Sequence, residues 1–320
     1  MRGKIIGTGS YAPAKVLDNN DLSKLVDTND EWIRERTGVV RRHIIEDETA
    51  TSMAAEAAKR ALENAQIDVE EIDLIIASTI SSNVILPCAA CEVQKEIGAV
   101  NATCFDLNAA CTGFVFAYNT AQAYIAAGTY KNVLVIGVEA LSNLVNWKDR
   151  STCILFGDGA GAAVVSAVDG NLFPMVAHSD GSRSEVLTCE SRHNKNWKNH
   201  LEDNSTYLQM HGQEVFKFAV RKVPEVIYEV LDAANISIEE IDLFVLHQAN
   251  RRIVESVAKK LKQPIEKFPM NMQEYGNTSS ASVGILLDEL NRDGKLVEGQ
   301  KVIIAGFGAG LSWGATLLEW

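Results

Sequence analysis

Residues 65–78 read AQIDVEEIDLIIAS, and residues 234–247 read ANISIEEIDLFVLH. The two segments lie 169 positions apart, and seven of their fourteen positions are identical. Each has the pattern of a helix end, an acidic turn and a buried strand. The same offset aligns VLVIGVEA (133–140) with VIIAGFGA (302–309), and Asn108 with Asn277. Three agreements at one offset indicate an internal duplication.

The duplication predicts how the chain is organised. Short runs of Val, Ile and Leu alternate with alanine-rich helical segments such as 50–64 and 113–127, which is typical of an α/β protein with buried, largely parallel sheets. No linker rich in Pro, Gly or Ser separates the repeats, so we expect two halves, 1–170 and 171–320, packed as one body. Ligands should bind near the strand ends where the halves meet. The hydrophilic stretch 182–206 is expected to be a surface excursion.

Composition narrows the class of function. A net charge of −12 disfavours a general nucleic-acid or anionic-membrane surface, because the overall field repels both. The first residues lack a signal-peptide core, and no apolar run approaches the ~20 residues that span a bilayer. We therefore expect a cytoplasmic protein. Six dispersed cysteines favour free thiols. The pair Cys88-x-x-Cys91 is expected to begin a helix, and a redox or metal role is the less favoured alternative.

Cys111 is the candidate nucleophile. It lies in DLNAACTGF (106–114), where a strand passes through small residues into a helical pattern. We expect its sulfur at a helix N-terminus, where the dipole and the free N–H groups lower a thiol pKa and can receive an oxyanion. The alternative interpretation is a small buried hydrophobic residue.

His247 and Asn277 complete a candidate constellation. His247 directly follows an apolar strand, and its duplicate position is Ser78. Asn277 lies in the turn EYGNTSSAS (274–282), and its duplicate, Asn108, lies three residues before Cys111. The repeat therefore predicts that these turns meet at related ends of the two halves. Neutral imidazole and carboxamide donors suit an enolate better than a peptide tetrahedral intermediate, although a structural histidine and a capping asparagine remain alternatives.

Several motifs together resemble one known family. They are NDEWIRERTGV (29–39), the Cys111 segment, FGDGAGA (156–162), HQAN (247–250), YGNTS (275–279) and the glycine-rich turn GFGAGLSW (306–313). Over nearly its full length the chain resembles the β-ketoacyl-acyl-carrier-protein synthase III family of condensing enzymes. The resemblance implies a thiolase-like α/β fold, a duplicated five-layer αβαβα body with two mixed sheets around buried helices. It also implies a homodimer.

The resemblance further implies an activity. It is the decarboxylative Claisen condensation of an acyl-CoA primer with malonyl-acyl carrier protein, which initiates fatty-acid biosynthesis through an acyl-cysteine intermediate. The expected primer is acetyl-CoA or another short acyl-CoA. The CoA thioester is a substrate, and no metal or other cofactor is expected.

Residue roles follow from the same resemblance. Cys111 would accept the acyl group, His247 and Asn277 would stabilise the enolate, and the amides of Cys111 and Ala309 would hold an oxyanion. The residues implied in CoA binding are Trp32, Arg36, Thr37, Arg150 and Asn250. Trp32 and Arg150 would sandwich the adenine. Leu86, contributed across the dimer, and Phe307 would line the acyl pocket. Where Leu86 stands, some relatives have phenylalanine, so the length of the primer stays open.

A basic segment is the candidate docking site for the acidic acyl carrier protein. Residues 248–262 (QANRRIVESVAKKLK) contain five basic residues and one glutamate, and part of this charge forms one helical strip. The docking residues implied are Gln248, Ala249, Asn250, Arg251 and Arg252. A solvated helix face is the alternative.

Other functions remain possible at this point. One is a related acyltransferase of secondary metabolism that uses the same Cys/His/Asn set. A second is a non-catalytic acyl-binding module, and a third is a papain-like hydrolase, which the duplicated architecture disfavours.

Overall fold

Two mixed sheets form the framework of the protein. The computed structural model describes residues 1–190 and 207–320, so most of the hydrophilic stretch 182–206 lies outside the described residues. The first sheet has the order β1 (Arg2–Tyr11), β7 (Gly159–Val168), β6 (Asn132–Glu139), β4 (Leu74–Ser78) and β5 (Thr103–Leu107). The second has the order β11 (Leu243–Leu246), β12 (Lys301–Gly308), β13 (Ser312–Glu319) and β8 (Met175–Ser179). Each sheet contains parallel and antiparallel pairs.

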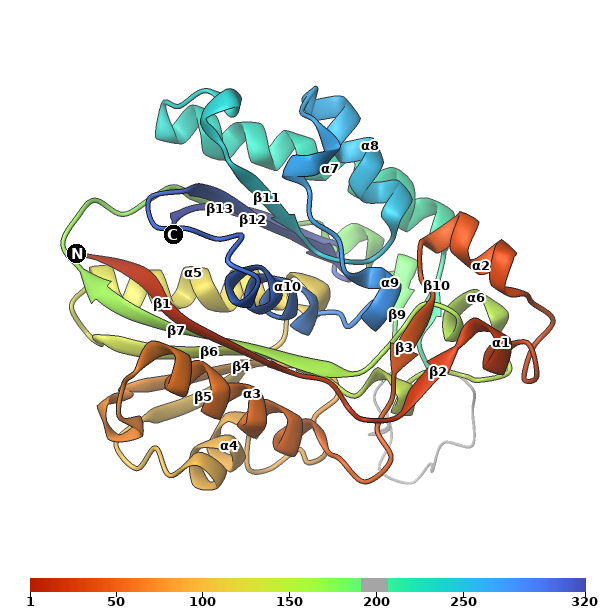
Figure 1. Cartoon of the computed structure of the whole chain (residues 1–320), viewed down its shortest axis with the longest axis horizontal. Helices are drawn as coiled ribbons and strands as arrows, with labels where there is room; N and C mark the ends of the chain where they lie inside the picture. The colour runs from red at the N-terminus through yellow and green to blue at the C-terminus, as the bar shows by residue number, and fades with distance from the viewer. Residues whose placement is uncertain (191–206) are drawn as a thin grey trace.

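Helices and sheets alternate in layers (Figure 1). Helices α3 (Ala50–Ala65) and α4 (Ala89–Ile97) cover the outer face of the first sheet, and α7 (Gly212–Ala234) and α8 (Arg251–Leu261) lie outside the second. Between the sheets lie α5 (Gly113–Ala126) and α10 (Ala281–Arg292). The predicted thiolase-like αβαβα order is confirmed.

The two repeated segments adopt the same local structure. Helix α3 ends before Gln66 and α7 before Asn235, and both capping residues have left-handed backbone, with φ of 54° and 53°. A short 3-10 turn follows in each case, η1 (Val69–Glu71) and η6 (Ile238–Glu240), and then β4 or β11. The predicted sequence of helix end, acidic turn and buried strand is confirmed in both places.

The central helices are buried because they are apolar on most of their surface. Phe114 and Tyr118 of α5 and Leu286 of α10 belong to one core cluster, which also contains Leu74 of the first sheet and Val245 of the second. Burial of this apolar surface on both sides of the helices is the main force that holds the two sheets together.

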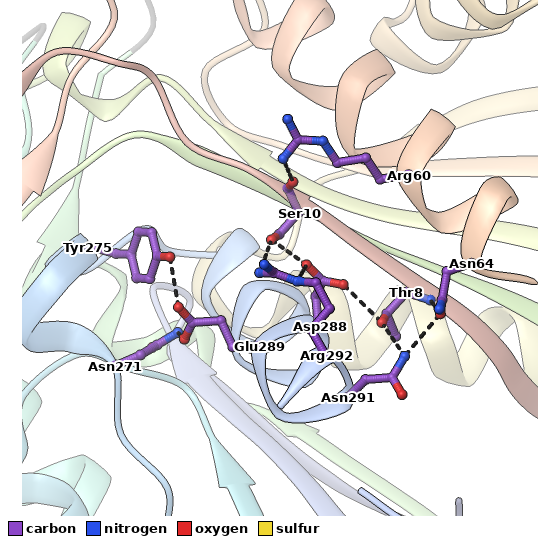
Figure 2. Close-up of polar contacts among 10 residues, drawn as sticks. All are labelled: Thr8, Ser10, Arg60, Asn64, Asn271, Tyr275, Asp288, Glu289, Asn291 and Arg292. Atoms are coloured by element: carbon purple, nitrogen blue, oxygen red, sulfur yellow. Dashed lines mark hydrogen bonds and ion pairs between the residues drawn. The ribbon is translucent and has the colours of Figure 1, made fainter. Parts of the chain in front are cut away.

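Polar contacts also join each central helix to the sheet of the other half. Figure 2 shows Asp288 of α10, whose carboxylate accepts hydrogen bonds from Thr8 Oγ1 (3.0 Å) and Ser10 Oγ (2.5 Å) of β1 and pairs with Arg292 Nε (3.0 Å). The equivalent residue of α5, 169 positions earlier, is Asn119, whose Oδ1 accepts from Thr316 on β13 (2.5 Å). The halves are therefore linked by hydrogen bonds as well as by the shared core.

Among the remaining elements, those in residues 16–43 and 141–153 share an apolar cluster and form a smaller lobe. All of the remaining elements are short. They are β2 (Val16–Asp18), α1 (Asn19–Leu22), α2 (Asp30–Thr37), β3 (Arg41–His43), η2 (Ala110–Thr112), η3 (Leu141–Asn143), α6 (Arg150–Cys153), η4 (Gly181–Val186), β9 (Leu187–Thr188), β10 (Gln209–Met210), η7 (Ile265–Lys267) and α9 (Met272–Tyr275). Fully buried Arg42 joins parts of this lobe through the carbonyls of Leu17 and Ile154. None of the helices in residues 1–190 and 207–320 is both long and apolar enough to span a membrane.

Candidate active site

Cys111 lies at the junction of the two halves. It belongs to η2, immediately before α5, and it lines a cavity of about 850 Å³. Gly308, the last residue of β12, packs directly against it, and a Cβ added there would lie 2.9 Å from Cys111 Cβ. Glycine is therefore required for this close approach. Ala110 and Ser279 near the thiol have left-handed backbone, with φ of 45° and 48°, a type of strain that is common at functional sites.

The thiol of Cys111 is neutral in the resting protein. Burial raises its pKa to about 12, and a hydrogen bond with the Ser279 side chain acts in the opposite direction. A backbone hydrogen bond at the helix start does lower the pKa, as predicted, but burial outweighs it, so the predicted net direction is wrong. The residue is only 7% exposed, so the loss of hydration outweighs the favourable helix end.

His247 is held as a neutral imidazole. It follows β11, and its Nδ1 lies 2.7 Å from Ser282 Oγ. Its ring lies edge-on to Phe307, with 5.1 Å between ring centroids. Burial lowers the pKa of His247 to about 3. A neutral imidazole keeps one N–H, so it can donate a hydrogen bond without carrying a charge.

Asn277 is fixed in the turn before α10. Its Oδ1 accepts a hydrogen bond from the Ser279 amide at 2.8 Å, and its own amide donates to the Leu155 carbonyl at 2.8 Å. With its oxygen engaged, the carboxamide has its N–H groups to offer to a ligand.

Shared neighbours connect the three predicted residues. Ser279 contacts both the Cys111 thiol and Asn277. Phe307 contacts His247 and directly precedes Gly308, which packs on Cys111. The cavity lining includes Cys111, Ser279 and Ala309. The structure thus brings these segments into one region, and the catalytic roles of the triad stay a prediction.

The residues predicted to bind CoA lie close to one another, four on the smaller lobe and Asn250 at the start of α8. Arg36 and Arg150 both face the Trp32 ring, with Cζ at 5.0 and 5.1 Å from its centroid. Asn250 caps α8 and donates from Nδ2 to the Arg36 carbonyl (2.9 Å). Thr37 is buried, and its hydroxyl donates to the Ile33 carbonyl (2.7 Å). An adenine ring could stack between Trp32 and Arg150 only if these side chains moved apart.

The placement of Gln248 contradicts one docking prediction. It is 1% exposed, and its amide bonds the Leu246 carbonyl and the Asn271 amide. A carrier protein cannot reach this side chain, because it packs inside the second half. Arg251 and Arg252 are exposed, and Ala249 is half-buried.

The predicted acyl-pocket residues lie at the edge of the cavity or outside it. Phe307 does not line the cavity, since its ring packs on His247. Leu86 is 85% exposed and is also absent from the lining, whereas its neighbour Ile85 lines the cavity. Their assignment to the acyl pocket stays a prediction.

Sequence reasoning missed three residues that surround the thiol: Ser279, Gly308 and Glu139. Glu139 is fully buried and raises the pKa of Cys111 through its charge. A signal for it existed, because it is a carboxylate at the end of the apolar run 133–138, and its duplicate position is Gly308.

The Cys88 and Cys91 pair begins a helix as predicted, with Cys88 as the N-cap of α4. The two sulfurs lie 3.4 Å apart as free thiols. No cluster of three or more His, Cys, Asp or Glu side chains suited to a metal ion occurs in the described residues.

Comparisons with known proteins agree with this architecture. The family described as 3-oxoacyl-[acyl-carrier-protein] synthase III matches residues 105–181. The family described as the C-terminal part of the same enzyme matches residues 231–320. β-Ketoacyl-[acyl-carrier-protein] synthase III of Clostridium acetobutylicum is 48% identical over 322 residues, with 99% of this chain and 98% of the relative covered.

Solved structures give the same answer. The crystal structure of 3-oxoacyl-[acyl-carrier-protein] synthase III from Aquifex aeolicus is 46% identical with a TM-score of 0.93, and 99% of this chain and 100% of that chain are covered. A priming β-ketosynthase of the R1128 polyketide pathway is 38% identical with a TM-score of 0.93, over 99% of this chain and 96% of that chain. With this identity along almost its whole length, the chain belongs to the β-ketoacyl-acyl-carrier-protein synthase III family of acyl-transferring condensing enzymes.

Proposed function

We propose that this enzyme joins an acyl-CoA primer to malonyl-acyl carrier protein and so starts fatty-acid biosynthesis. The observation that carries the proposal is a buried cysteine on a cavity of about 850 Å³, in contact with Gly308 and Ser279 of the other half. Such a cavity can hold a short acyl chain away from water.

The first half-reaction is acylation of Cys111. Its sulfur attacks the carbonyl carbon of the primer thioester, the carbon–sulfur bond to CoA breaks, and the proton lost by the thiol ends on the sulfur of the departing CoA, so that an acyl-cysteine and free CoA remain. The negative charge that develops on the carbonyl oxygen would be stabilised by the backbone amides of Cys111 and Ala309.

The second half-reaction is the condensation. The malonyl group loses carbon dioxide, and its thioester oxygen takes the negative charge of an enolate. The N–H groups of neutral His247 and of Asn277 would donate to this oxygen. A neutral histidine suits this step, because its low pKa means that no acidic imidazolium is present to protonate the enolate carbon. That carbon then attacks the acyl-cysteine carbonyl and releases the thiolate of Cys111.

Surface features support the proposed substrates and assembly. Trp32, Arg36 and Arg150 would bind the CoA nucleotide. Exposed Arg251 and Arg252 on α8 would attract the acidic carrier protein. Ile85 and Leu86 are 66% and 85% exposed, and a homodimer would cover them and complete the pocket. We place the enzyme in the cytoplasm, where both thioester substrates are made.

Mass spectrometry of the intact protein tests the proposal. After incubation with a panel of acyl-CoA thioesters, we expect one acyl group per chain, most rapidly from acetyl-CoA or another short primer. Cys111→Ala should abolish this addition, whereas Cys153→Ala, which changes another buried thiol, should retain it. Addition that survives in Cys111→Ala would contradict the assignment of the nucleophile.

A second candidate is the priming of a secondary metabolic pathway, favoured by the likeness to the R1128 ketosynthase. The two candidates differ in the carrier protein used. Carbon dioxide release with acetyl-CoA and malonyl-fatty-acid carrier protein supports the first. Release only with another carrier would support the second.

A further inference from the structure

Two hydroxyl groups form a hydrogen-bonded link across the junction of the two halves, beside Cys111. Thr112, the last residue of η2, has its Oγ1 at 2.6 Å from Oγ of Ser312, the first residue of β13. Ser312 Oγ donates to the Ala309 carbonyl at 2.9 Å. Thr112 is 0% exposed and Ser312 is 5% exposed, so water competes little for these bonds. The proposed reaction gives roles to Cys111 and Ala309 but none to the two hydroxyls.

The direction of the two hydrogen bonds follows from the protons available. A hydroxyl has one proton to donate and two lone pairs with which to accept. Ser312 uses its proton on the Ala309 carbonyl, so the Thr112 hydroxyl is the donor of the 2.6 Å bond. The link therefore runs from the segment of the nucleophile to Ala309, and the loss of either hydroxyl breaks it.

Close packing holds the other side of the Ala309 amide. A Cβ added at Gly308 would lie 2.9 Å from Cys111 Cβ and 3.0 Å from the Cys111 amide nitrogen. The Ala309 amide thus lies between Gly308, which packs on Cys111, and the Ala309 carbonyl, which Ser312 binds. Both sides of this amide are anchored to η2, one by packing and one by the hydroxyls.

The hydroxyl link occurs at one of the two equivalent junctions. At the offset of 169, the counterparts of Thr112 and Ser312 are Ala281 and Asn143. An alanine side chain cannot form a hydrogen bond, so the counterpart junction cannot contain the same link. The duplicated scaffold does not need it at both places, and it is found at the junction that contains the cysteine.

The alignment of the two segments matters because one oxygen must receive two amides. Cys111 and Ala309 come from different halves, and both line the cavity. Oxyanion donors act at about 2.7 to 3.1 Å from the oxygen, so a small shift between the segments takes one donor out of range. Within residues 1–190 and 207–320, no hydrogen bond other than that of Thr112 and Ser312 joins η2 to β12, β13 or the turn between them.

We propose that Thr112 and Ser312 are positioning residues that hold the Ala309 amide in line with the Cys111 amide during acylation. As the sulfur of Cys111 bonds to the carbonyl carbon of the primer, an electron pair moves from the C=O bond to the oxygen, and the two amides stabilise its charge. When the pair returns, the bond from this carbon to the CoA sulfur breaks, and CoA takes the proton that the thiol lost. The inference rests on the proposed function, in which Cys111 carries the acyl group.

A purely structural role of the two hydroxyls predicts a different result. Looser packing or a displaced sulfur would slow every reaction of Cys111. Acylation places a negative charge on a carbonyl oxygen, whereas alkylation by iodoacetamide displaces iodide at a methylene carbon and forms no oxyanion. The ratio of the two rates therefore reports the alignment of the amides.

The test follows three reactions of Cys111 by intact mass: acylation by acetyl-CoA, acylation by p-nitrophenyl acetate and alkylation by iodoacetamide. Thr112→Val and Ser312→Ala should slow both acylations about 10-fold, less than the loss of a whole oxyanion donor would. The acetyl-CoA concentration that gives half the maximal rate should not change, because the lost stabilisation belongs to the transition state. Alkylation should keep its original rate.

Two further variants are controls. Thr112→Ser keeps a hydroxyl and should restore acylation to nearly the original rate. Thr120→Val makes the same change on α5, where the hydroxyl donates to the Phe116 carbonyl of its own helix at 2.8 Å. It should leave all three reactions unchanged.

Each outcome decides the proposal. Acylation at the original rate in both Thr112→Val and Ser312→Ala would overturn it, and so would an equal loss of acylation and alkylation. If Thr112→Val does not fold, Ser312→Ala decides, since it breaks the same link. Should acetyl-CoA fail to acylate the unmodified protein, the proposed function fails, and p-nitrophenyl acetate still tests the alignment of the amides.

Discussion

The ends of β6 and β12 are equivalent positions in the two halves, yet one carries Glu139 and the other Gly308, 169 residues later. Each strand end faces the N-terminus of the other half's central helix. Gly308 lets the β12 backbone touch Cys111, whereas Glu139 fills the corresponding space and binds Ser279 and Ser280. The two repeats therefore place equivalent residues at equivalent strand ends, and the different residues found there give each strand end its own contacts.

The largest expected effect is on the rate of Cys111 acylation, and it comes from adding a methyl group at Gly308. In Gly308→Ala the new Cβ would lie 2.9 Å from Cys111 Cβ and 3.0 Å from its amide nitrogen, so η2 must shift. A displacement of this kind should slow acylation of Cys111 by acetyl-CoA about 10²-fold, because small misplacements of a nucleophile are costly. Rapid-quench mass spectrometry measures the rate.

Gly181→Ala is the matched control for that prediction, since a Cβ at Gly181 has nothing within 4 Å. It should acylate at the original rate. Equal rates for Gly308→Ala and Gly181→Ala would show that the close approach of β12 has no functional importance.

A smaller effect, on the free energy of unfolding, should differ between the two central helices. Asp288→Ala removes an acceptor shared by Thr8, Ser10 and Arg292, and we expect it to lower the free energy of unfolding by about 2 kcal/mol. The equivalent change in α5, Asn119→Ala, removes one hydrogen bond to Thr316 and should cost about 1 kcal/mol. Urea unfolding followed by circular dichroism gives both values. Equal losses would mean that the wider network of Figure 2 adds nothing to the single bond.

The smallest expected effect is on the KM for malonyl-acyl carrier protein, and it should differ between the outer helices α8 and α4. Arg252→Ala on α8 is expected to raise the KM for malonyl-acyl carrier protein about fivefold, because a charge that attracts the acidic partner is lost. Lys95→Ala, on the exposed face of α4, should leave this KM unchanged. The difference should shrink at high salt, where screening weakens long-range attraction. An equal response of both variants would argue against α8 as the docking helix.

The duplication made most of the fold predictable from sequence. The segments 65–78 and 234–247 gave the correct order of helix end, turn and strand, because their apolar pattern and acidic turn are local signals. The thiolase-like order of layers came from the resemblance of the motifs to a family.

The site was predictable only in part. The strand ends and the internal repeat are visible in the sequence, and together they pointed to Cys111, His247 and Asn277. It does not show how deeply a group is buried, so the pKa of Cys111 was predicted in the wrong direction, and Gln248 was placed on the surface. Contacts across the halves, such as that of Gly308 with Cys111, depend on packing between segments about 200 residues apart.

Residues of the second half complete the surroundings of Cys111 in the first half, and this has a consequence for synthesis of the chain. Cys111 leaves the ribosome long before Ser279 and Gly308, which complete its surroundings. Until the last strands arrive, the cavity beside Cys111 lacks Ser279 and Ala309, which complete its lining. An unfinished chain should therefore be unable to capture acyl groups, so that reactivity arises only with the completed molecule.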